Sequence, residues 1–211
     1  MKIRSTNLAI PKKVMWRGKE ISTGIFKTPV EGPIYLGVET VAKDVIADRR
    51  VHGGVDKACY LLSSDQYTYW KALYPELEWN WGMFGENLTV DGLDEDSIYI
   101  GNIYEIGSAL VQVSQPREPC YKLGIRFGSQ KILLQFISHA QPGTYVRVLR
   151  EGAVSPGDNL KLVEASSNAL TVRDFFSLIF SPVKDQQLLQ MAIDNNALPA
   201  NKRAGLKKFM E

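Results

Sequence analysis

The chain has 211 residues, enough for one sizeable domain with a small appendage but not for two large domains. Hydrophobic residues make up 45% and charged residues 23%, a globular composition that excludes intrinsic disorder and fibrous repeats. Twenty-five Lys and Arg against 23 Asp and Glu leave a net charge of +2, which gives no reason to expect a nucleic-acid or membrane surface.

The chain contains few residues that could form disulfides or bind metal ions. Two cysteines and two histidines cannot build a disulfide framework, a His-rich metal site or a four-cysteine zinc site. The first residues lack the apolar stretch of a secretory signal, and no segment reaches the roughly 18 apolar residues of a membrane span. We therefore expect a soluble, cytoplasmic protein that is stabilised by packing.

Short alternating segments rich in β-branched residues begin near residue 34 and are separated by Gly, Pro, Asn and Asp. Such a series predicts a mainly β (α+β) fold, with a barrel or sandwich of mostly antiparallel sheet. The predicted strands are 34–41, 58–62, 88–90, 103–106, 110–113, 144–149 and 160–163.

Two helices are predicted within this series of strands. Ser63 and Gln66 have the spacing of a capping box at the start of one helix, which Pro75 ends. Ser129 is the expected N-cap of the other, whose apolar stripe covers residues 132–137. Both helices are expected to lie on the sheet.

The composition changes at residues 164–169, where small and polar residues replace the alternating pattern. We place a boundary there, between a β-barrel domain of residues 1–164 and a three-helix domain of residues 169–211. About forty residues in short helices cannot bury much area alone, so they should dock on the barrel or on a partner.

Capping signals predict where these C-terminal helices begin. Thr171 and Asp174 form a capping box for the first helix, and Ser181-Pro182 can start the second. A short basic helix follows Pro199, and its lysines, including Lys202, are interpreted as a solvated face.

Cys120 follows the second of two prolines in a loop at the end of a predicted strand. Arg117, Lys122 and Arg126 lie close in sequence, and nearby cations favour the thiolate, which acts as a nucleophile or as a soft metal ligand. The alternative is a buried cysteine that packs as a small hydrophobic residue. Cys59 lies within an apolar strand, where core packing is the favoured interpretation.

Two glycine loops are further candidates for binding sites. His52 precedes Gly53 and Gly54, which allow positive φ and a close backbone approach to an anionic ligand. The alternative is a glycine turn that carries a solvated histidine. In the second loop, Gly85 precedes Glu86 and Asn87, and the Asn87 amide could bind the edge of a heterocycle, although Asn near Gly is also ordinary in turns.

In this order, the three loops resemble the MOSC family, named for the C-terminal domain of molybdenum cofactor sulfurases, and within it the stand-alone bacterial YiiM-like proteins. The resemblance covers nearly the whole chain, because the C-terminal residues are similar to the three-helix domain of YiiM-like members. The matching residues are His52-Gly53-Gly54 with Asp56-Lys57, then Gly82 and Gly85-Glu86-Asn87-Leu88, then Pro116-Arg117 and Pro119-Cys120.

This resemblance implies a MOSC-type β-barrel with a molybdenum cofactor pocket, in which Cys120 binds the molybdenum of Mo-molybdopterin. It implies reduction of N-hydroxylated compounds, including hydroxylaminopurine-type base analogues, and thus a role in detoxification. The expected cofactor-binding residues are His52, Gly53, Gly54, Asn87, Arg117 and Cys120. The catalytic residues would be Cys120 and His52, with His52 or an ordered water as the proton donor.

The length leaves no room for the large pyridoxal-phosphate domain of full sulfurases, and no flavin or iron–sulfur module is evident. Electrons would therefore come from a separate reductase. Two alternatives remain: a cofactor or sulfur carrier without turnover, and a metal-free thiol enzyme that uses Cys120 as its nucleophile but lacks a histidine partner by spacing. The sequence does not specify an oligomeric state.

Overall fold

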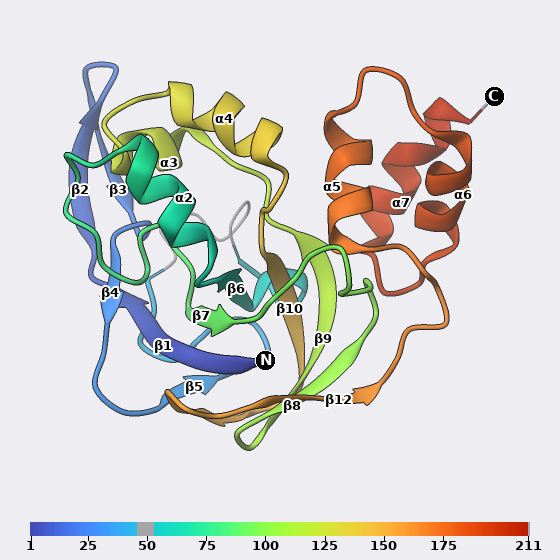
Figure 1. Ribbon diagram of the computed structural model, residues 1–211, viewed down its shortest axis with the longest axis horizontal. Coiled ribbons are helices and arrows are strands. Elements are labelled where there is room, and N and C mark those ends of the chain that lie inside the picture. Colours follow the sequence, from blue (N-terminus) through green and yellow to red (C-terminus); the bar gives the residue numbers. More distant parts are fainter. Residues whose placement is uncertain (46–52, 211) are drawn as a thin grey trace.

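The computed structural model describes residues 1–45 and 53–210 and contains an eight-stranded sheet with strand order β12-β8-β9-β10-β6-β7-β1-β4 (Figure 1). Neighbouring strands are antiparallel, except that β6 and β7 run parallel. The strands are β1 (Lys2–Ala9), β4 (Lys27–Pro29), β6 (Cys59–Ser63), β7 (Leu88–Asp91), β8 (Ile103–Ile106), β9 (Ala109–Pro116), β10 (Thr144–Arg150) and β12 (Leu160–Glu164).

The N-terminal end of β1 lies beside the start of β12, the strand at one end of this sheet. Lys2 of β1 forms an antiparallel bridge with Asn159, directly before β12. The Ile3 N–H donates to the Asp158 carbonyl at 2.8 Å, and the Leu160 N–H donates to the Met1 carbonyl at 3.0 Å. These contacts wrap the sheet round on itself and cover part of the edge of β12, while β4 stays the last strand at the other end. The predicted barrel is confirmed.

Two smaller pairs of strands complete the β structure. β2 (Lys12–Trp16) and β3 (Lys19–Thr23) form a hairpin, and β5 (Ile34–Leu36) pairs with β11 (Gly152–Val154). The sequence predicted a strand at 34–41 but none before it, so strands β1 to β4 are found only in the structure.

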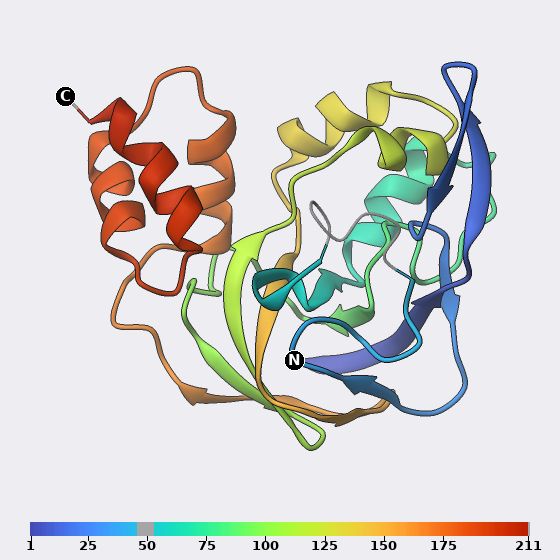
Figure 2. The same ribbon diagram turned by 180° about the vertical axis from the view of Figure 1, so that it is seen from behind.

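Three helices gather at one end of the barrel: α2 (Gln66–Leu73), α3 (Tyr121–Arg126) and α4 (Lys131–His139) (Figures 1 and 2). Beneath them lies a mainly aromatic core that includes the buried side chains of Trp70, Phe84 and Phe136. The predicted capping serines lie one to two residues before the positions that directly precede the helices, Asp65 for α2 and Gln130 for α4. Their hydroxyls still accept from backbone N–H groups there: Ser63 from Asp65 at 3.4 Å and Ser129 from Lys131 at 3.3 Å.

The C-terminal helices α5 (Val172–Phe180), α6 (Gln186–Asp194) and α7 (Ala200–Leu206) stand beside the barrel (Figure 2). The Thr171 hydroxyl accepts from the Asp174 N–H at 2.9 Å, which confirms the predicted cap of α5. The predicted start of α6 at Ser181-Pro182 is wrong, because Asp185 caps this helix by accepting from the Leu188 N–H at 2.9 Å.

The C-terminal helices share a hydrophobic core with the barrel. Phe175, Leu178 and Leu189 belong to the same buried cluster as Val111 and Val113 of β9. Burial of each such side chain contributes roughly 1.5 to 3 kcal/mol. The expectation that these helices dock on the barrel is therefore confirmed, whereas the domain boundary at residues 164–169 stays a prediction. No described helix is long and apolar enough to cross a membrane.

Candidate functional site

A pocket, here called the cysteine pocket, brings together residues from several loops that are distant in sequence. Cys120, Arg117 and Asn87, three of the predicted site residues, all line it. His52 lies outside the described residues, so its predicted roles stay predictions. The complete lining is Thr23, Gly24, Ile25, Lys27, Asp44, Val45, Lys57, Ala58, Tyr60, Phe84, Gly85, Asn87, Arg117, Cys120, Lys122 and Tyr145.

The backbone around Cys120 fixes the position of the thiol. Strand β9 ends at Pro116, and four residues later Cys120 has an extended conformation directly before α3. Its carbonyl accepts from the Leu123 N–H at 2.9 Å in the first turn of that helix. Cys120 is half-buried and lines the pocket. The thiol can therefore meet a ligand in the pocket.

Arg117 places a buried guanidinium group in the same pocket. The residue is 5% exposed, and its guanidinium lies over the ring of Phe136 at 5.2 Å and that of Tyr60 at 5.8 Å. Its Nη1 has no hydrogen-bond partner among the described residues. An unpaired donor on a buried cation is costly, so this atom marks the position of an anionic or hydrogen-bond-accepting ligand group.

The side-chain amide of Asn87 is hydrogen-bonded to neighbouring residues of the protein. Its side-chain Nδ2 donates to Asp44 Oδ2 at 2.8 Å, and its Oδ1 accepts from the Tyr60 N–H at 3.2 Å. Lys27 forms an ion pair with the same Asp44 carboxylate, and the two side chains are 9% and 4% exposed. Asn87 thus positions a buried ion pair at the pocket wall, and its contact with a cofactor stays a prediction.

The loop of residues 82–87 is a rigid wall built around Glu86. The fully buried Glu86 carboxylate accepts from the Gly82 N–H at 2.8 Å and the Phe84 N–H at 3.1 Å. Burial raises the pKa of Glu86 above its ordinary value, although hydrogen bonds from the Tyr67 hydroxyl, the Gly82 N–H and the Thr89 hydroxyl act in the opposite direction. Gly82 has φ +86°, and a Cβ there would lie 2.9 Å from the Lys27 carbonyl, so only glycine fits.

Lys57 and Tyr145 supply further hydrogen-bonding groups to the pocket, and the Lys57 ammonium lies 5.9 Å from the centre of the Tyr145 ring. Burial raises the pKa of Tyr145 to about 12, so the phenol keeps its proton at neutral pH. Burial lowers the pKa of Lys57, and the positive charge of Lys202 lowers it further. Glu118, Asp56 and Cys120 act in the opposite direction.

The other cysteine and the described histidine lie elsewhere. Cys59 is 1% exposed and burial raises its pKa to about 12, which confirms its predicted place in the core. His139 stacks on Tyr69 with ring centroids 4.0 Å apart and does not line the cysteine pocket. Among the described lining residues there is no histidine to activate Cys120 as a nucleophile.

The described residues contain no group of three or more His, Cys, Asp or Glu that could hold a metal ion. A metal in the cysteine pocket would therefore need ligands from an organic cofactor, with the soft sulfur of Cys120 as a protein ligand. The donor set fits a cofactor that brings its own metal and carries an anionic group.

Comparison with known proteins identifies the family. The MOSC domain matches residues 48–161. The chain belongs to the MOSC domain family. It is 36% identical over 206 residues to the YflK protein of Bacillus subtilis (strain 168), which covers 98% of this chain and 93% of that protein. It is also 36% identical to YiiM of Escherichia coli (strain K12), covering 78% of this chain and 75% of that protein.

Solved MOSC-family relatives confirm the YiiM-like fold. The crystal structure of YiiM from Geobacillus stearothermophilus has a TM-score of 0.83 and 32% identity, covering 100% of this chain and 99% of that chain. The crystal structure of YiiM from Escherichia coli has a TM-score of 0.76 and 26% identity, and the match covers 99% of this chain and 92% of that chain. The match therefore includes the C-terminal helices as well as the barrel.

Sequence reasoning missed much of the pocket lining, including the polar residues Lys27, Asp44 and Tyr145. Lys27 and Asp44 precede the three recognised loops, and no local motif marks either residue. Tyr145 lies in a predicted strand, but alternation alone does not reveal that its ring reaches a pocket. These residues become recognisable only when β4, β6 and β10 are assembled around the same cavity.

Proposed function

We propose that this MOSC-family protein binds a molybdenum cofactor in the cysteine pocket and reduces N-hydroxylated compounds, including hydroxylaminopurine-type base analogues. One observation carries the proposal: the Cys120 thiol shares a pocket with buried Arg117, whose Nη1 lacks a described partner. A soft ligand and an unsatisfied cationic donor are what a metal cofactor with an anionic group requires.

Each part of a molybdopterin has a counterpart in the pocket. Cys120 would bind the metal, and Arg117 would bind an anionic oxygen. Lys122, which is 9% exposed, adds a second positive charge. Asn87 and the backbone at Gly85 form a wall on which a flat heterocycle could lie. The bound cofactor would supply two-electron redox chemistry.

Reduction of an N–OH group to an amine consumes two electrons and two protons and releases water. The lowered pKa of Lys57 makes its ammonium a better proton donor than an exposed lysine, and Lys57 lines the pocket. Tyr145 retains its proton and can orient an acceptor atom. The hypothesis that His52 donates a proton concerns a residue outside the described part of the chain.

The electrons would come from a separate reductase, and we propose a cytoplasmic role in detoxification. A relative from Gibberella moniliformis named "Reductase" is 34% identical over 70% of this chain, and the match covers 27% of that protein. The relative's name supports redox chemistry in proteins that contain this domain. It does not extend to the substrate of this chain.

The test is to produce the protein in a cofactor-competent host, measure its molybdenum content, and follow 6-N-hydroxylaminopurine with a chemical reductant. We expect bound molybdenum and conversion to adenine. Bound molybdenum without turnover would support a cofactor or sulfur carrier instead. Turnover by protein that contains no molybdenum would contradict the proposal and favour a metal-free thiol enzyme.

A further inference from the structure

A second pocket lies between the barrel and the C-terminal helices, and we call it the interdomain pocket. Residues 53–57 and Gln115 of β9 line it from the barrel. Pro199, Asn201 and Lys202, at the start of α7, line it from the other side. The predicted glycine pair, Gly53 and Gly54, therefore faces this pocket rather than the cysteine pocket.

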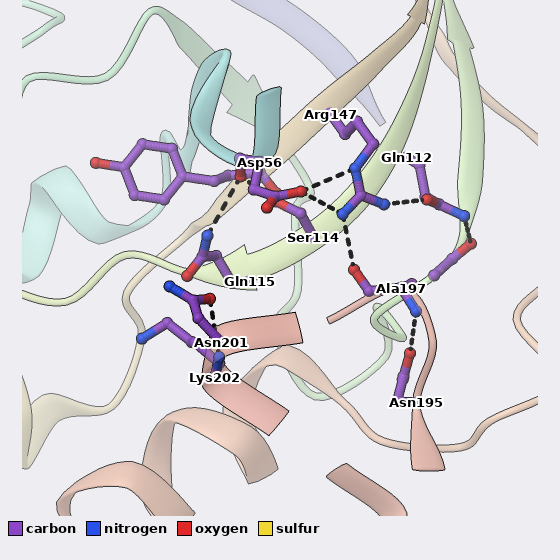
Figure 3. Close-up of polar contacts among 11 residues, drawn as sticks. Asp56, Gln112, Ser114, Gln115, Arg147, Asn195, Ala197, Asn201 and Lys202 are labelled. Carbon is purple, nitrogen blue, oxygen red and sulfur yellow. Dashed lines mark hydrogen bonds and ion pairs between the residues drawn. The ribbon is translucent and has the colours of Figure 1, made fainter. Parts of the chain in front are cut away.

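Gln115 carries an unpaired acceptor in this pocket. The residue is 2% exposed, and its Oε1 has no hydrogen-bond partner among the described residues. Its Nε2 is turned toward the Asp56 carbonyl, at 3.4 Å. Figure 3 shows the Gln115 side chain facing Asn201 and Lys202 of α7. A buried amide oxygen without a donor costs about 1 to 3 kcal/mol, so a ligand N–H or O–H is the expected partner.

The walls of the interdomain pocket are held in place from both sides. Arg147 Nε donates to Asp56 Oδ1 at 3.0 Å, and its Nη2 donates to the Ala197 carbonyl at 3.1 Å (Figure 3). The Ser114 hydroxyl donates to the Asp56 carbonyl at 2.7 Å. The polar lining is therefore preorganised, as a specific binding site requires.

The interdomain pocket adjoins the cysteine pocket. Lys57 lines both pockets, and its pKa responds to the charges of Lys202 on one side and Cys120 on the other. Lys202 also forms an ion pair with Glu118, two residues before Cys120. The two pockets therefore share a wall at Lys57. Lys202, interpreted from the sequence as a solvated charge, belongs to this junction.

The hydrogen-bonding pattern defines the ligand class. Gln115 Oε1 requires a donor. The ammonium groups of Lys57 and Lys202, the latter paired with Glu118, place positive charge on the same lining, which favours an acceptor atom beside them. Phosphate or sulfate offers mainly acceptors and would leave the Gln115 oxygen unpaired. An uncharged amide, amidoxime or nucleobase edge, with an N–H beside an acceptor atom, matches both requirements.

We infer that the interdomain pocket is the substrate subsite and binds an uncharged, planar ligand through an N–H beside an acceptor atom, with its reducible group directed toward Cys120. This assignment rests on the proposed function, which supplies the reaction and the reducible group of the substrate. It makes the C-terminal helices part of the substrate site, whereas every site residue predicted from the sequence precedes them.

The kinetic test compares two variants, one from each wall. Gln115→Met keeps the side-chain length and removes the acceptor, and Lys202→Met removes the opposing donor. Each should raise KM for 6-N-hydroxylaminopurine about tenfold, the equivalent of one lost hydrogen bond, with molybdenum content unchanged. Gln115→Met should also keep the wild-type kcat, because it leaves the charges around Lys57 in place. Glu118→Gln breaks the same ion pair as Lys202→Met but does not line the pocket, so its KM should stay at the wild-type value.

A binding test needs neither molybdenum nor turnover, so it separates failure of the subsite from failure of the proposed function. Benzamide carries N–H groups beside a carbonyl, and N,N-dimethylbenzamide lacks both N–H groups. Calorimetry or an NMR titration should show benzamide binding that weakens about tenfold in Gln115→Met. The dimethyl compound should bind wild type weakly, with no further loss in the variant. Equal benzamide affinity in wild type, Gln115→Met and Lys202→Met would overturn the inference.

Discussion

The two cysteines are each followed by a tyrosine, yet their surroundings differ completely. Cys59 lies in β6, 1% exposed, and burial raises its pKa to about 12. Cys120 lies in a loop between β9 and α3, half-buried in a pocket with Arg117 and Lys57. The comparison shows that the same dipeptide can place a thiol in a core or in a pocket. The surroundings of the thiol depend on the element that carries it and on the residues packed around that element.

The tyrosines repeat the contrast. Tyr60 is 3% exposed, and its hydroxyl donates to the Pro142 carbonyl at 2.7 Å. Tyr121 is 36% exposed and stacks on Trp16 of the β2–β3 hairpin, with ring centroids 5.3 Å apart. Cys59 and Tyr60 are both buried, Cys59 in the barrel core and Tyr60 in the aromatic core where it also lines the cysteine pocket, whereas Tyr121 forms a surface contact.

The largest expected effect separates the two cysteines. Cys120→Ala should abolish N-hydroxy reduction and leave the free energy of unfolding nearly unchanged, because the proposal makes its half-buried thiol a ligand and not a packing group. Cys59→Ala should spare turnover and lower the free energy of unfolding by about 1 to 3 kcal/mol, as a small core deletion does. Turnover assays and urea unfolding check both variants. Equal losses of activity and of stability in the two variants would break the comparison.

Arg117 should have the next largest effect, on cofactor occupancy. Arg117→Ala removes the buried donor that faces the pocket and should lower molybdenum content about tenfold or more. Arg117→Lys keeps the charge but loses the planar fork, so occupancy should be intermediate. Metal analysis of the purified variants measures this, with Arg4, an exposed partner of Asp91, changed to Ala as the control. Wild-type molybdenum in Arg117→Ala would show that the guanidinium serves packing alone.

Glu95 tests whether burial shifts the pKa of a carboxyl group, as it does for the thiol of Cys59. Burial raises the pKa of Glu95 from 4.5 to about 7. Between these values Glu95 binds more protons in the native protein than in the unfolded chain. Its contribution to the free energy of unfolding is therefore fully present below pH 4.5 and is lost as the pH rises to 7. The upper bound is on the order of 3 kcal/mol. Urea unfolding at pH 5 and pH 8 should show this loss in wild type and a smaller one in Glu95→Gln; identical losses would exclude Glu95 as the cause.

The smallest effect concerns the contact beside the Cys120 loop. Trp16→Ala removes the ring that stacks on Tyr121 and should lower the free energy of unfolding by about 1 kcal/mol or less. Turnover should be retained, because the fold of the loop depends on β9 and α3. Thermal unfolding and activity are the measurements, and loss of activity would show that the hairpin positions Cys120.

The central strands were predictable because their pattern is apolar and periodic. The strand at 103–106 agrees with β8 residue for residue, and 58–62 differs from β6 by one residue at each end. The MOSC resemblance rested on three loops, and two of them meet: Asn87, Arg117 and Cys120 line the same pocket, whereas Gly53 and Gly54 line the interdomain pocket. Local capping chemistry also identified the start of α5 correctly at Thr171.

Strand β1 escaped detection because its interior is polar. Ser5, Thr6 and Asn7 are 6%, 0% and 0% exposed, so they are as buried as any core residue. Ser5 donates to Asn7 Oδ1 at 2.8 Å, and Asn7 Nδ2 donates to Thr89 Oγ1 at 3.1 Å. Hydrogen bonding compensates for burial, and no hydrophobic alternation remains for a sequence pattern to reveal.

The interdomain pocket could not be predicted because residues 53–57 and Gln115 on one wall are at least 84 residues from Pro199, Asn201 and Lys202 on the other. Gln115 reads as an ordinary residue of a strand end, and Lys202 as one of several exposed cations. Only the docking of the C-terminal helices on the barrel places them around the same space. Sequence motifs reveal binding sites formed by one local loop, whereas this pocket forms only when distant segments pack together.

Molybdenum content, measured by mass spectrometry on protein from a cofactor-competent host, tests the central claim most directly. Wild type and Cys59→Ser should contain molybdenum in similar amounts per folded chain, and Cys120→Ser should contain far less, because a hydroxyl is a poor ligand where a soft sulfur is required. Equal molybdenum content in Cys120→Ser and wild type would contradict the account.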